Sequence, residues 1–372
     1  MKRMIKFPSI SQYRQIVKEI TERACFIGLD ELGKPEFDYC IPKPVVDFSI
    51  TTKIHGTNAG VCYSESDNLW CQSRENIIST EKDNYGFAWF CEQNKEIVIS
   101  IIKELAKENN IDLNTHIISV FGEWCGSSIQ KGVAVAELDK RFVIFEHFKV
   151  SPLEHQENSD EENIEKAKWY KTISYSDFGV PHPTIEWAES PENKIFNIMN
   201  FPTNTNRTIS IDFNNPERAQ NELIKIMEEV EAECPVGKAF GVSGTGEGVV
   251  ISHLTPDGSL IQAKVKGGAH AKGSGKVKTL KVVDTEKLDK IDKCIEEICH
   301  EWRFAQGLRE VFGVEYEDNI DRSKISLYLK WVATDTLKEE SDIIQEYGFE
   351  PKDVIGKVQQ KAKDYFFAVE QL

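Results

Sequence analysis

The feature that most constrains the fold of this chain is one change of hydrophobic period, near residue 283. Before it, occasional helical spacing at 94–108 and 216–232 interrupts short β-rich runs, which are VVDFSITTK, AGVCYS, HIISVFGEW, RFVIFEHF, GVVISH and SLIQAKVKG. After it, apolar residues recur at helical spacing, as at Leu288, Ile291, Ile295 and Ile298. A period of two is typical of strands and a period of 3.6 is typical of helices. We therefore predict an α+β domain over residues 1–282 and a smaller all-α domain over residues 283–372.

The charge and composition limit the classes of protein. The formal net charge of −16 argues against a protein that coats nucleic acid, because binding by counterion release requires a positive surface. The opening residues MKRMIKFPSI lack the apolar segment of a signal peptide, and no run approaches the roughly 20 apolar residues of a membrane span. Nine cysteines are scattered without a C-x-x-C pair, which is typical of reduced cysteines in a core. We expect a soluble, cytoplasmic, monomeric protein that does not bind membranes.

Two glycine-rich segments do not fit the known phosphate-binding loops. In HAKGSGKVK, His270 stands where a P-loop has its first glycine, and Val277 replaces the hydroxyl residue that holds magnesium. The segment GVSGTGEGVV fits neither the dinucleotide fingerprint nor the kinase loop. The basic segment from Lys264 to Lys281 contains no acidic residue and has two interpretations, a phosphate-binding track and a solvated linker. Its other lysines include Lys266, Lys272, Lys276 and Lys278.

The segment GEGVVISHLTPDGSLIQAKVKG predicts a β-hairpin that turns at Pro256-Asp257-Gly258. Alternation places Lys264 and Lys266 on one face of the second strand. If Pro256 and Asp257 are the two turn residues, Glu247 lies opposite Lys266 and Val249 opposite Lys264. By itself, this pattern also fits an ordinary cross-strand ion pair on an exposed sheet, which contributes little to stability.

Six short motifs follow one another along the chain: KIHGTN at 53–58, SRE at 73–75, FGEW at 121–124, VIFEH at 143–147, EGVV at 247–250 and AKVK at 263–266. In this order and at these intervals, residues 45 to 270 resemble the covalent nucleotidyltransferases, which include ATP-dependent DNA ligases, RNA ligases and mRNA capping enzymes. The histidine of K-x-H-G resembles the RNA ligase 2 family. The resemblance implies a ligase-type nucleotidyltransferase domain with antiparallel sheets, and an ATP-dependent RNA ligase that joins a 3′-OH to a 5′-phosphate.

The resemblance also implies a role for each matching residue. Lys53 matches the nucleophile that forms a lysine-linked AMP, and Lys264 and Lys266 match lysines that neutralise phosphate charge. An ammonium has no lone pair, so neighbouring cations would help by favouring loss of its proton. Glu247 matches an acid that binds a divalent metal, Mg²⁺ or Mn²⁺, and Glu123 matches an acid that holds ribose hydroxyls, although these two roles could be exchanged. The remaining nucleotide-binding candidates are Ile54, His55, Asn58, Arg74 on the phosphate or ribose side, and Phe145 stacked on adenine.

Two departures from the family pattern concern the base. Many members carry glutamate immediately before the nucleophile, whereas this chain has Thr52. If that acid helps to recognise adenine, the chain recognises the base in another way or has a relaxed preference. Glu146 also stands where aspartate commonly follows the aromatic residue. ATP remains the expected nucleotide.

Alternatives with the same lysine chemistry are a DNA ligase and a capping-type guanylyltransferase, which normally append an oligonucleotide-binding barrel that the helical C-terminal pattern does not support. A non-catalytic RNA-binding relative is a third alternative, although it should have lost at least one of Lys53, Glu247, Lys264 and Lys266. We expect the partner to be nicked or structured RNA, and we expect residues 283–372 to bind the RNA end. The other interpretation is a domain that only stabilises the catalytic core.

Overall fold

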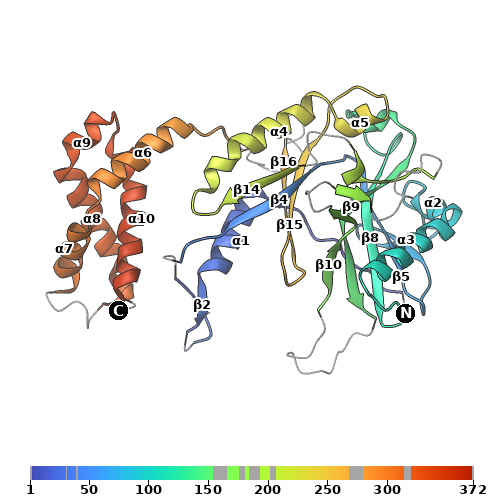
Figure 1. Ribbon diagram of the computed structural model, residues 1–372, viewed down its shortest axis with the longest axis horizontal. Helices are drawn as coiled ribbons and strands as arrows, with labels where there is room; N and C mark the ends of the chain where they lie inside the picture. The colour runs from blue at the N-terminus through green and yellow to red at the C-terminus, as the bar shows by residue number, and fades with distance from the viewer. Residues whose placement is uncertain are drawn as a thin grey trace. The chain divides into compact units, whose positions relative to one another are not determined.

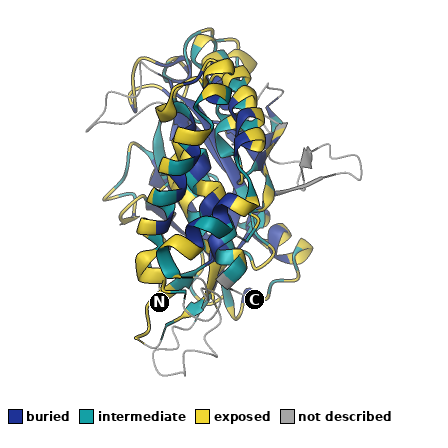
Figure 2. Ribbon diagram, turned by 90° about the vertical axis from the view of Figure 1, so that its left-hand side faces the viewer, coloured by how far each residue is buried: buried dark blue, intermediate teal, exposed yellow. Residues whose placement is uncertain are grey.

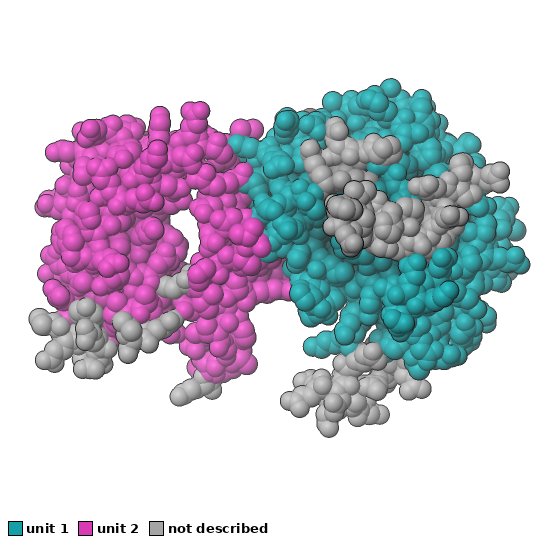
Figure 3. Space-filling model, viewed as in Figure 1, with its two compact units in different colours: residues 1–16, 46–211, 219–281 teal, residues 17–45, 212–218, 282–372 magenta. Residues whose placement is uncertain are grey.

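The computed structural model describes residues 2–30, 32–38, 41–153, 166–175, 181–183, 193–201, 207–267, 280–313 and 320–370. It divides into two compact units, coloured separately in Figure 3. The first unit comprises Met1–Ile16, Val46–Ile211 and Ala219–Lys281, and the second comprises Val17–Val45, Asp212–Arg218 and Val282–Leu372. The expected division into 1–282 and 283–372 did not include the two shorter segments of the second unit.

The first unit contains a five-stranded sheet in the order β1-β16-β15-β4-β14 (Figure 1). Its strands are β1 (Ser11–Gln12), β4 (Val45–Thr52), β14 (Arg207–Asp212), β15 (Gly248–Leu254) and β16 (Leu260–Lys266). β15 is antiparallel to both β4 and β16, whereas β1 runs parallel to β16. The helices α4 (Gln220–Ala232) and α5 (Pro235–Ala239) follow β14 in the chain. The helix predicted to begin at Pro216 has a 3₁₀ turn over Pro216–Ala219 before α4.

A second sheet of the same unit contains seven strands. They are β5 (Thr57–Tyr63), β6 (Trp70–Ser73), β7 (Ile77–Ile78), β8 (His116–Cys125), β9 (Arg141–Pro152), β10 (Lys168–Lys171) and β13 (Ile195–Asn197). The path β10-β9-β8-β5-β6-β7 is antiparallel, and β13 pairs with β9 in parallel. The short 3₁₀ turns of this unit include Ala134–Glu137 and Ile198–Asn200. The α+β class with antiparallel sheets is therefore confirmed.

Two helices pack against the second sheet, α2 (Phe87–Gln93) and α3 (Lys95–Glu108). The face of α3 that the periodicity predicted is buried, with Val98, Ile101, Ile102 and Leu105 in one core cluster. This cluster includes inward-facing residues of β5 and β8, such as Val61 and Val120. Two short strands, β11 (Ile173–Tyr175) and β12 (Pro181–Pro183), form a separate antiparallel pair.

The hairpin of β15 and β16 differs from the expected register by one residue. Lys266 lies opposite Gly248, not Glu247, and Lys264 lies opposite Val250, not Val249. The reason is the turn: Thr255 N–H donates to the Ser259 carbonyl at 2.9 Å, so that three residues and not two connect the strands. Gly258 has a φ of +84°, the left-handed conformation that a three-residue loop requires at this position. Lys264 and Lys266 still share one face.

The second unit contains five α-helices in the residues after 282 that the structure describes. They are α6 (Thr285–Ile298), α7 (Glu301–Phe312), α8 (Ile325–Glu339), α9 (Ser341–Glu346) and α10 (Pro351–Glu370), with a 3₁₀ turn at Arg322–Lys324. Leu308, Tyr328 and Phe366 are fully buried in their common core. Figure 2 shows these helices with buried residues on one side and exposed residues on the other. The periodic apolar residues of these helices therefore form a separate hydrophobic core in the second unit.

The N-terminal part of the second unit is a short hairpin of β2 (Phe26–Leu29) and β3 (Pro35–Phe37). It follows α1 (Tyr13–Cys25), whose Ile16 and Ile20 are buried. Among the helices described, none combines the length and hydropathy needed to cross a bilayer.

Candidate active site

Lys53 directly follows the last residue of β4, in the middle of the first unit. The strand before it is buried from Phe48 to Thr52, and Val249 of β15 pairs with Thr52. The Lys53 N–H donates to the Gly248 carbonyl at 2.8 Å, which continues the ladder by one bond. The side chain is 19 % exposed. A lysine at this place is held by the sheet at its backbone while its ammonium can still reach a ligand.

The ammonium of Lys53 belongs to a charge cluster centred on Glu247. The Lys53 Nζ lies 2.6 Å from Glu247 Oε2, and His55 Nδ1 lies 3.1 Å from the same oxygen. Lys266 Nζ lies 2.5 Å from the other oxygen, Oε1. Burial acts to raise the pKa of Glu247, whose side chain is 3 % exposed, but the His55 hydrogen bond and the two lysines outweigh it and hold the pKa well below its usual range. Glu247 is therefore a carboxylate shared by two lysines.

Gly248 explains how Glu247 reaches Lys266 although the two residues are not paired. Gly248 has a φ of +140°, a conformation that L side chains rarely adopt. A Cβ at this position would lie 2.2 Å from the backbone carbonyl oxygen of Val265. The chain therefore turns at Gly248, immediately before the regular ladder begins. We attribute the contact between Glu247 and Lys266 to this turn and not to the strand register.

Lys264 adds a further positive charge beside the cluster. Burial lowers the pKa of Lys264, and the charges of Lys266, Lys53 and Arg74 lower it further. No ion pair of Lys264 with a carboxylate occurs among the residues described. Arg74 itself is half exposed, lies 3.6 Å from a Glu75 oxygen and donates to Ser9 Oγ at 3.0 Å. A site with an excess of positive charge is suited to bind a phosphate.

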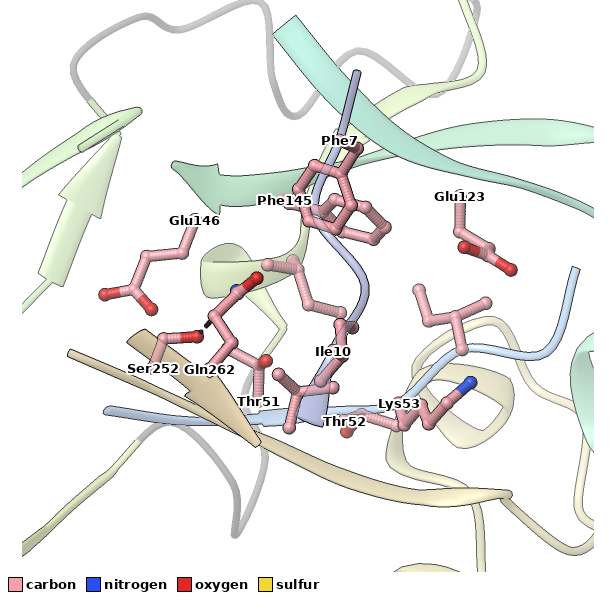
Figure 4. A pocket seen from close by; sticks show the side chains of 13 residues that line it. Phe7, Ile10, Thr51, Thr52, Lys53, Glu123, Phe145, Glu146, Ser252 and Gln262 are labelled. Atoms are coloured by element: carbon pink, nitrogen blue, oxygen red, sulfur yellow. Dashed lines mark hydrogen bonds between the residues drawn. The ribbon is translucent and has the colours of Figure 1, made fainter. Parts of the chain in front are cut away.

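A pocket with about 450 Å³ of empty space, part of it open to solvent, begins at Lys53 and extends between the two sheets. Figure 4 shows Phe145 above Thr51 and Thr52, with Lys53 and Glu123 at one end and Glu146, Ser252 and Gln262 at the other. Its apolar part is lined by Phe7, Ile10, Ile54, Phe145, Ile198 and Val250. An aromatic ring over an apolar floor, with charged groups at one end, can hold a nucleotide.

Phe145 and Glu146 both line this pocket although they are neighbours in the chain. Neighbouring residues of a regular strand point to opposite faces. The pairing of β8 with β9 is interrupted here: Val120 lies opposite Phe148, whereas Gly122 lies opposite Ile144, so β9 has two extra residues. Thr172 satisfies the bulged backbone, because its N–H donates to the Glu146 carbonyl at 2.7 Å and its hydroxyl to the Phe145 carbonyl at 2.9 Å. The bulge directs both side chains to the pocket.

Glu123 lies on β8 at the same end of the pocket as Lys53 (Figure 4). Its Oε1 accepts a hydrogen bond of 2.9 Å from the Gly56 N–H. Burial raises the pKa of Glu123 to about 7, against the opposing effects of the Lys53 charge and the Gly56 hydrogen bond. Asn58 of β5 pairs with Glu123 across the sheet but is not among the pocket residues.

The residues present fit a divalent metal that is held partly by a substrate. No group of three or more metal-binding side chains is preassembled in the described part of the chain. Glu247 nevertheless lies 2.6 Å from Lys53, and Glu123 lies at the same end of the pocket as Lys53 (Figure 4). Mg²⁺ usually binds one or two carboxylates, with substrate phosphates and waters as the other ligands. Glu123 and Glu247 are therefore the residues that would hold such a metal.

The structure brings most of the candidate residues of the sequence together. Lys53, Ile54, Glu123 and Phe145 line the pocket, and Lys53, His55 and Lys266 all contact Glu247. Arg74 and Asn58 are at the edge of this group. Lys272, Lys276 and Lys278 of the basic segment lie outside the described residues.

Several pocket residues escaped the sequence analysis. Phe7 packs on Phe145, with ring centroids 5.2 Å apart, but no local pattern relates residue 7 to residue 145. Val250 and Gln262 also line the pocket. The alternation that placed Lys264 and Lys266 on one face also places Gln262 there, and this signal could have identified it.

Comparisons with known proteins identify the family of the chain. A family model described as RNA ligase matches residues 46–266, more than half of the chain. Solved structures of a Naegleria gruberi RNA ligase are similar: one with PPi has 14% sequence identity and a TM-score of 0.37, and a variant with ATP and Mn has 14% identity and a TM-score of 0.38. In both cases 72% of this chain is covered, and the chain spans only 57% of the solved structure. No curated protein matches the chain.

Proposed function

Because the chain belongs to the RNA ligase family, we propose that it joins RNA ends through an AMP bound covalently to Lys53. In the first step the lone pair of Lys53 Nζ attacks the α-phosphorus of ATP. A P–N bond forms, the bond from the α-phosphorus to the bridging oxygen breaks, and pyrophosphate leaves with the electron pair. The AMP then passes to a 5′-phosphate RNA end, and a 3′-hydroxyl attacks that end and displaces AMP.

The observation that supports this proposal is the position of Lys53. Its ammonium lies at the charged end of a pocket that has an aromatic wall, Phe145, over an apolar floor. Stacking of a base on an aromatic ring is worth about 1–3 kcal/mol. Lys264 and Lys266 are suited to stabilise negative charge on the α-phosphate, because both lie on β16 and Lys266 contacts the same Glu247 carboxylate as Lys53.

Before the attack, the Lys53 ammonium must lose a proton. Its contact with the Glu247 carboxylate at 2.6 Å stabilises the protonated form and therefore opposes this loss. We assign Glu247 and Glu123 to Mg²⁺ or Mn²⁺, which when bound supplies charge neutralisation on the phosphates. Glu247 would then have another cation to balance it, and its hold on the Lys53 ammonium would weaken. Lys266, which lies 2.5 Å from Glu247 Oε1, keeps the carboxylate in place.

The decisive experiment incubates the protein with α-labelled ATP and Mg²⁺ and measures label that stays on the denatured protein. We expect acid-labile labelling that Lys53→Ala abolishes. Lys82→Ala is the matched control, since Lys82 is exposed in a loop and should label as the wild type does. Absence of label on the wild type, or equal labelling of Lys53→Ala, would show that the assignment is wrong. A parallel reaction with GTP tests the guanylyltransferase alternative, and nicked DNA tests the DNA ligase alternative.

We further propose that the helical part of the second unit helps to bind the RNA end. Alignment of the 5′-phosphate requires such a grip, because a misplacement of 1 Å can cost about 10²-fold in rate. The residues from 282 to 372 comprise 21 acidic and 13 basic side chains, so contact with RNA must come from local basic groups and not from net charge. Exposed candidates are Lys324, the residue before α8, and Lys330 on α8.

Truncation after Lys281 is the direct test of this role, and we expect it to keep labelling from ATP but to impair sealing. The truncation also removes the rest of the unit to which Val17–Val45 and Asp212–Arg218 belong, so it changes the packing of these segments as well as any contact with RNA. The full-length double variant Lys324→Glu/Lys330→Glu avoids this difficulty. It should label normally and seal 5′-phosphate RNA at least several-fold more slowly at low salt. Unchanged sealing by both proteins would leave the second unit without a substrate role.

A further inference from the structure

One face of the sheet formed by β16, β15 and β4 changes its chemistry along the strands. The pairing defines three rows across this face. The first row contains Lys53, Gly248 and Lys266, and the second contains Thr51, Val250 and Lys264. The third row contains Ser49, Ser252 and Gln262. Along the strands, the face therefore changes from two lysines in the first row, through a mixed second row, to neutral hydrogen-bonding side chains in the third row.

The spacing of the rows suits a nucleotide. Residues that share a face are two apart, and each pair of residues advances a strand by about 6.7 Å, so the first and third rows are about 13 Å apart. A nucleotide with its α-phosphate at Lys53 and its base under Phe145 directs the far edge of the base toward the third row. Figure 4 shows Ser252 and Gln262 at the end of the pocket opposite Lys53.

The third row has one acceptor that the protein itself leaves unused. Gln262 Nε2 donates to Ser252 Oγ at 3.0 Å, whereas Gln262 Oε1 is shielded from solvent and has no hydrogen-bond partner among the described residues. Buried polar atoms are normally satisfied, so an unsatisfied one in a ligand pocket indicates a missing donor. The terminal amide torsion of glutamine is broad, and a small rotation can direct this oxygen into the pocket.

A buried carboxylate stands beside the same row. Ser49 Oγ donates to Glu146 Oε2 at 2.5 Å and also to the Ser252 carbonyl at 3.1 Å. Glu146 is 3 % exposed, and Lys171 Nζ lies 3.6 Å from its other oxygen. The end of the pocket is thus rich in acceptors. An amino group fits such a place, and a carbonyl oxygen does not.

We propose that Gln262 is the residue that selects adenine, and that its Oε1 accepts a hydrogen bond from the 6-amino group. Guanine has a carbonyl oxygen at the same position, which would face Gln262 Oε1 and the Glu146 carboxylate. The amide of glutamine matches the donor and acceptor pattern of adenine in other contexts as well. If the acid that many family members carry at the position of Thr52 contacts the base, Gln262 takes over that contact in this chain. The inference rests on the proposed function, because it concerns the nucleotide that Lys53 attacks.

The test measures the initial rate of covalent labelling of the full-length protein at low nucleotide concentration. Three nucleotides are compared: ATP, GTP, and purine riboside 5′-triphosphate, which differs from ATP only in lacking the 6-amino group. We expect the wild type to prefer ATP over the purine riboside analogue about 10- to 100-fold, because an unpaired acceptor in a polar site rejects an analogue without the donor. Gln262→Met, of similar size but without hydrogen-bonding groups, should reduce this preference to less than about threefold.

Two further variants make the result specific. Gln262→Glu keeps an acceptor and should keep a preference for ATP above about tenfold. Gln93→Met makes the same substitution at an exposed residue of α2 and should behave as the wild type does. The preference is a ratio measured on one protein sample, so a partly unfolded variant does not distort it.

The outcomes separate this inference from the proposed function. If the wild type forms no covalent nucleotide from any of the three, the proposed function fails and the base assignment fails with it. If the wild type labels but does not distinguish ATP from the purine riboside analogue, only the base assignment is wrong. The same conclusion follows if Gln262→Met keeps the full preference of the wild type.

Discussion

Gly248→Ala is the change that tests most directly how this fold assembles its site. Gly248 has a φ of +140°, and the added Cβ would lie 2.2 Å from the Val265 carbonyl oxygen and 3.0 Å from Lys266 Cα. These are backbone atoms of the next strand, so no side chain can rotate to make room. The backbone conformation alone costs about 1–3 kcal/mol in a residue other than glycine. Relief of the collision requires β15 and β16 to separate where Glu247 meets Lys266.

We expect two consequences of Gly248→Ala. The melting temperature should fall by about 2–12 °C, which corresponds to 1–3 kcal/mol at 2–4 °C per kcal/mol for a unit of this size. Labelling from ATP should fall by about 10²-fold, because a shift of 1 Å in a positioned group has an effect of that order. Thermal unfolding followed by circular dichroism and the initial rate of labelling measure the two.

The matched control is Gly241→Ala, at a glycine that has a φ of +78° but no heavy atom within 4 Å of an added Cβ. It includes the backbone strain without the collision and should leave labelling unchanged. If Gly248→Ala melts within 1 °C of the wild type and labels at the same rate, the turn at Gly248 does not position Glu247, and our explanation is wrong.

Three further predictions concern the pocket. Lys264→Met should slow labelling by about 10²-fold while the melting temperature stays the same or rises, because burial and nearby cations lower the pKa of Lys264 and its charge does not stabilise the fold; a large loss of stability would contradict this. For Glu123, whose pKa is raised from 4.5 to about 7, the folded chain retains a proton that the unfolded chain releases. The unfolding free energy of the wild type relative to Glu123→Gln should therefore fall as pH rises from about 5 to 7 and then level off, and denaturant titrations that give a constant difference would refute the assignment. Phe145→Ala should weaken ATP binding about 10- to 100-fold in equilibrium titration, whereas Phe145→Tyr should bind as the wild type does.

Local patterns in the sequence were sufficient for the secondary structure around the site. Alternation along GVVISH and LIQAKVK predicted β15 and β16, and the spacing of Val98, Ile101, Ile102 and Leu105 predicted the buried face of α3. These predictions succeed because the side-chain direction of a strand or helix repeats over two to four residues. The order of the six motifs then indicated the family that the match over residues 46–266 confirms.

The tertiary structure decided how these elements meet. The hairpin turn holds three residues and not two, so Gly248 and not Glu247 lies opposite Lys266. The conformation of Gly248 nevertheless brings the Glu247 carboxylate to Lys266. The bulge in β9 turns both Phe145 and Glu146 into the pocket, against the alternation that a regular strand would show. Neither detail could be read from spacing, because the length of a turn and the place of a bulge depend on the strand that pairs with them.

The sequence by itself therefore determined which residue types stand on which strand, and with them Lys53 as the candidate nucleophile. Only the tertiary structure brought Phe7 onto Phe145, placed Gln262 at the far end of the pocket and joined Val17–Val45 to the helical unit. The physical reason is the range of the interactions: periodicity is set by neighbours in the chain, whereas a pocket is closed by contacts between residues more than a hundred positions apart.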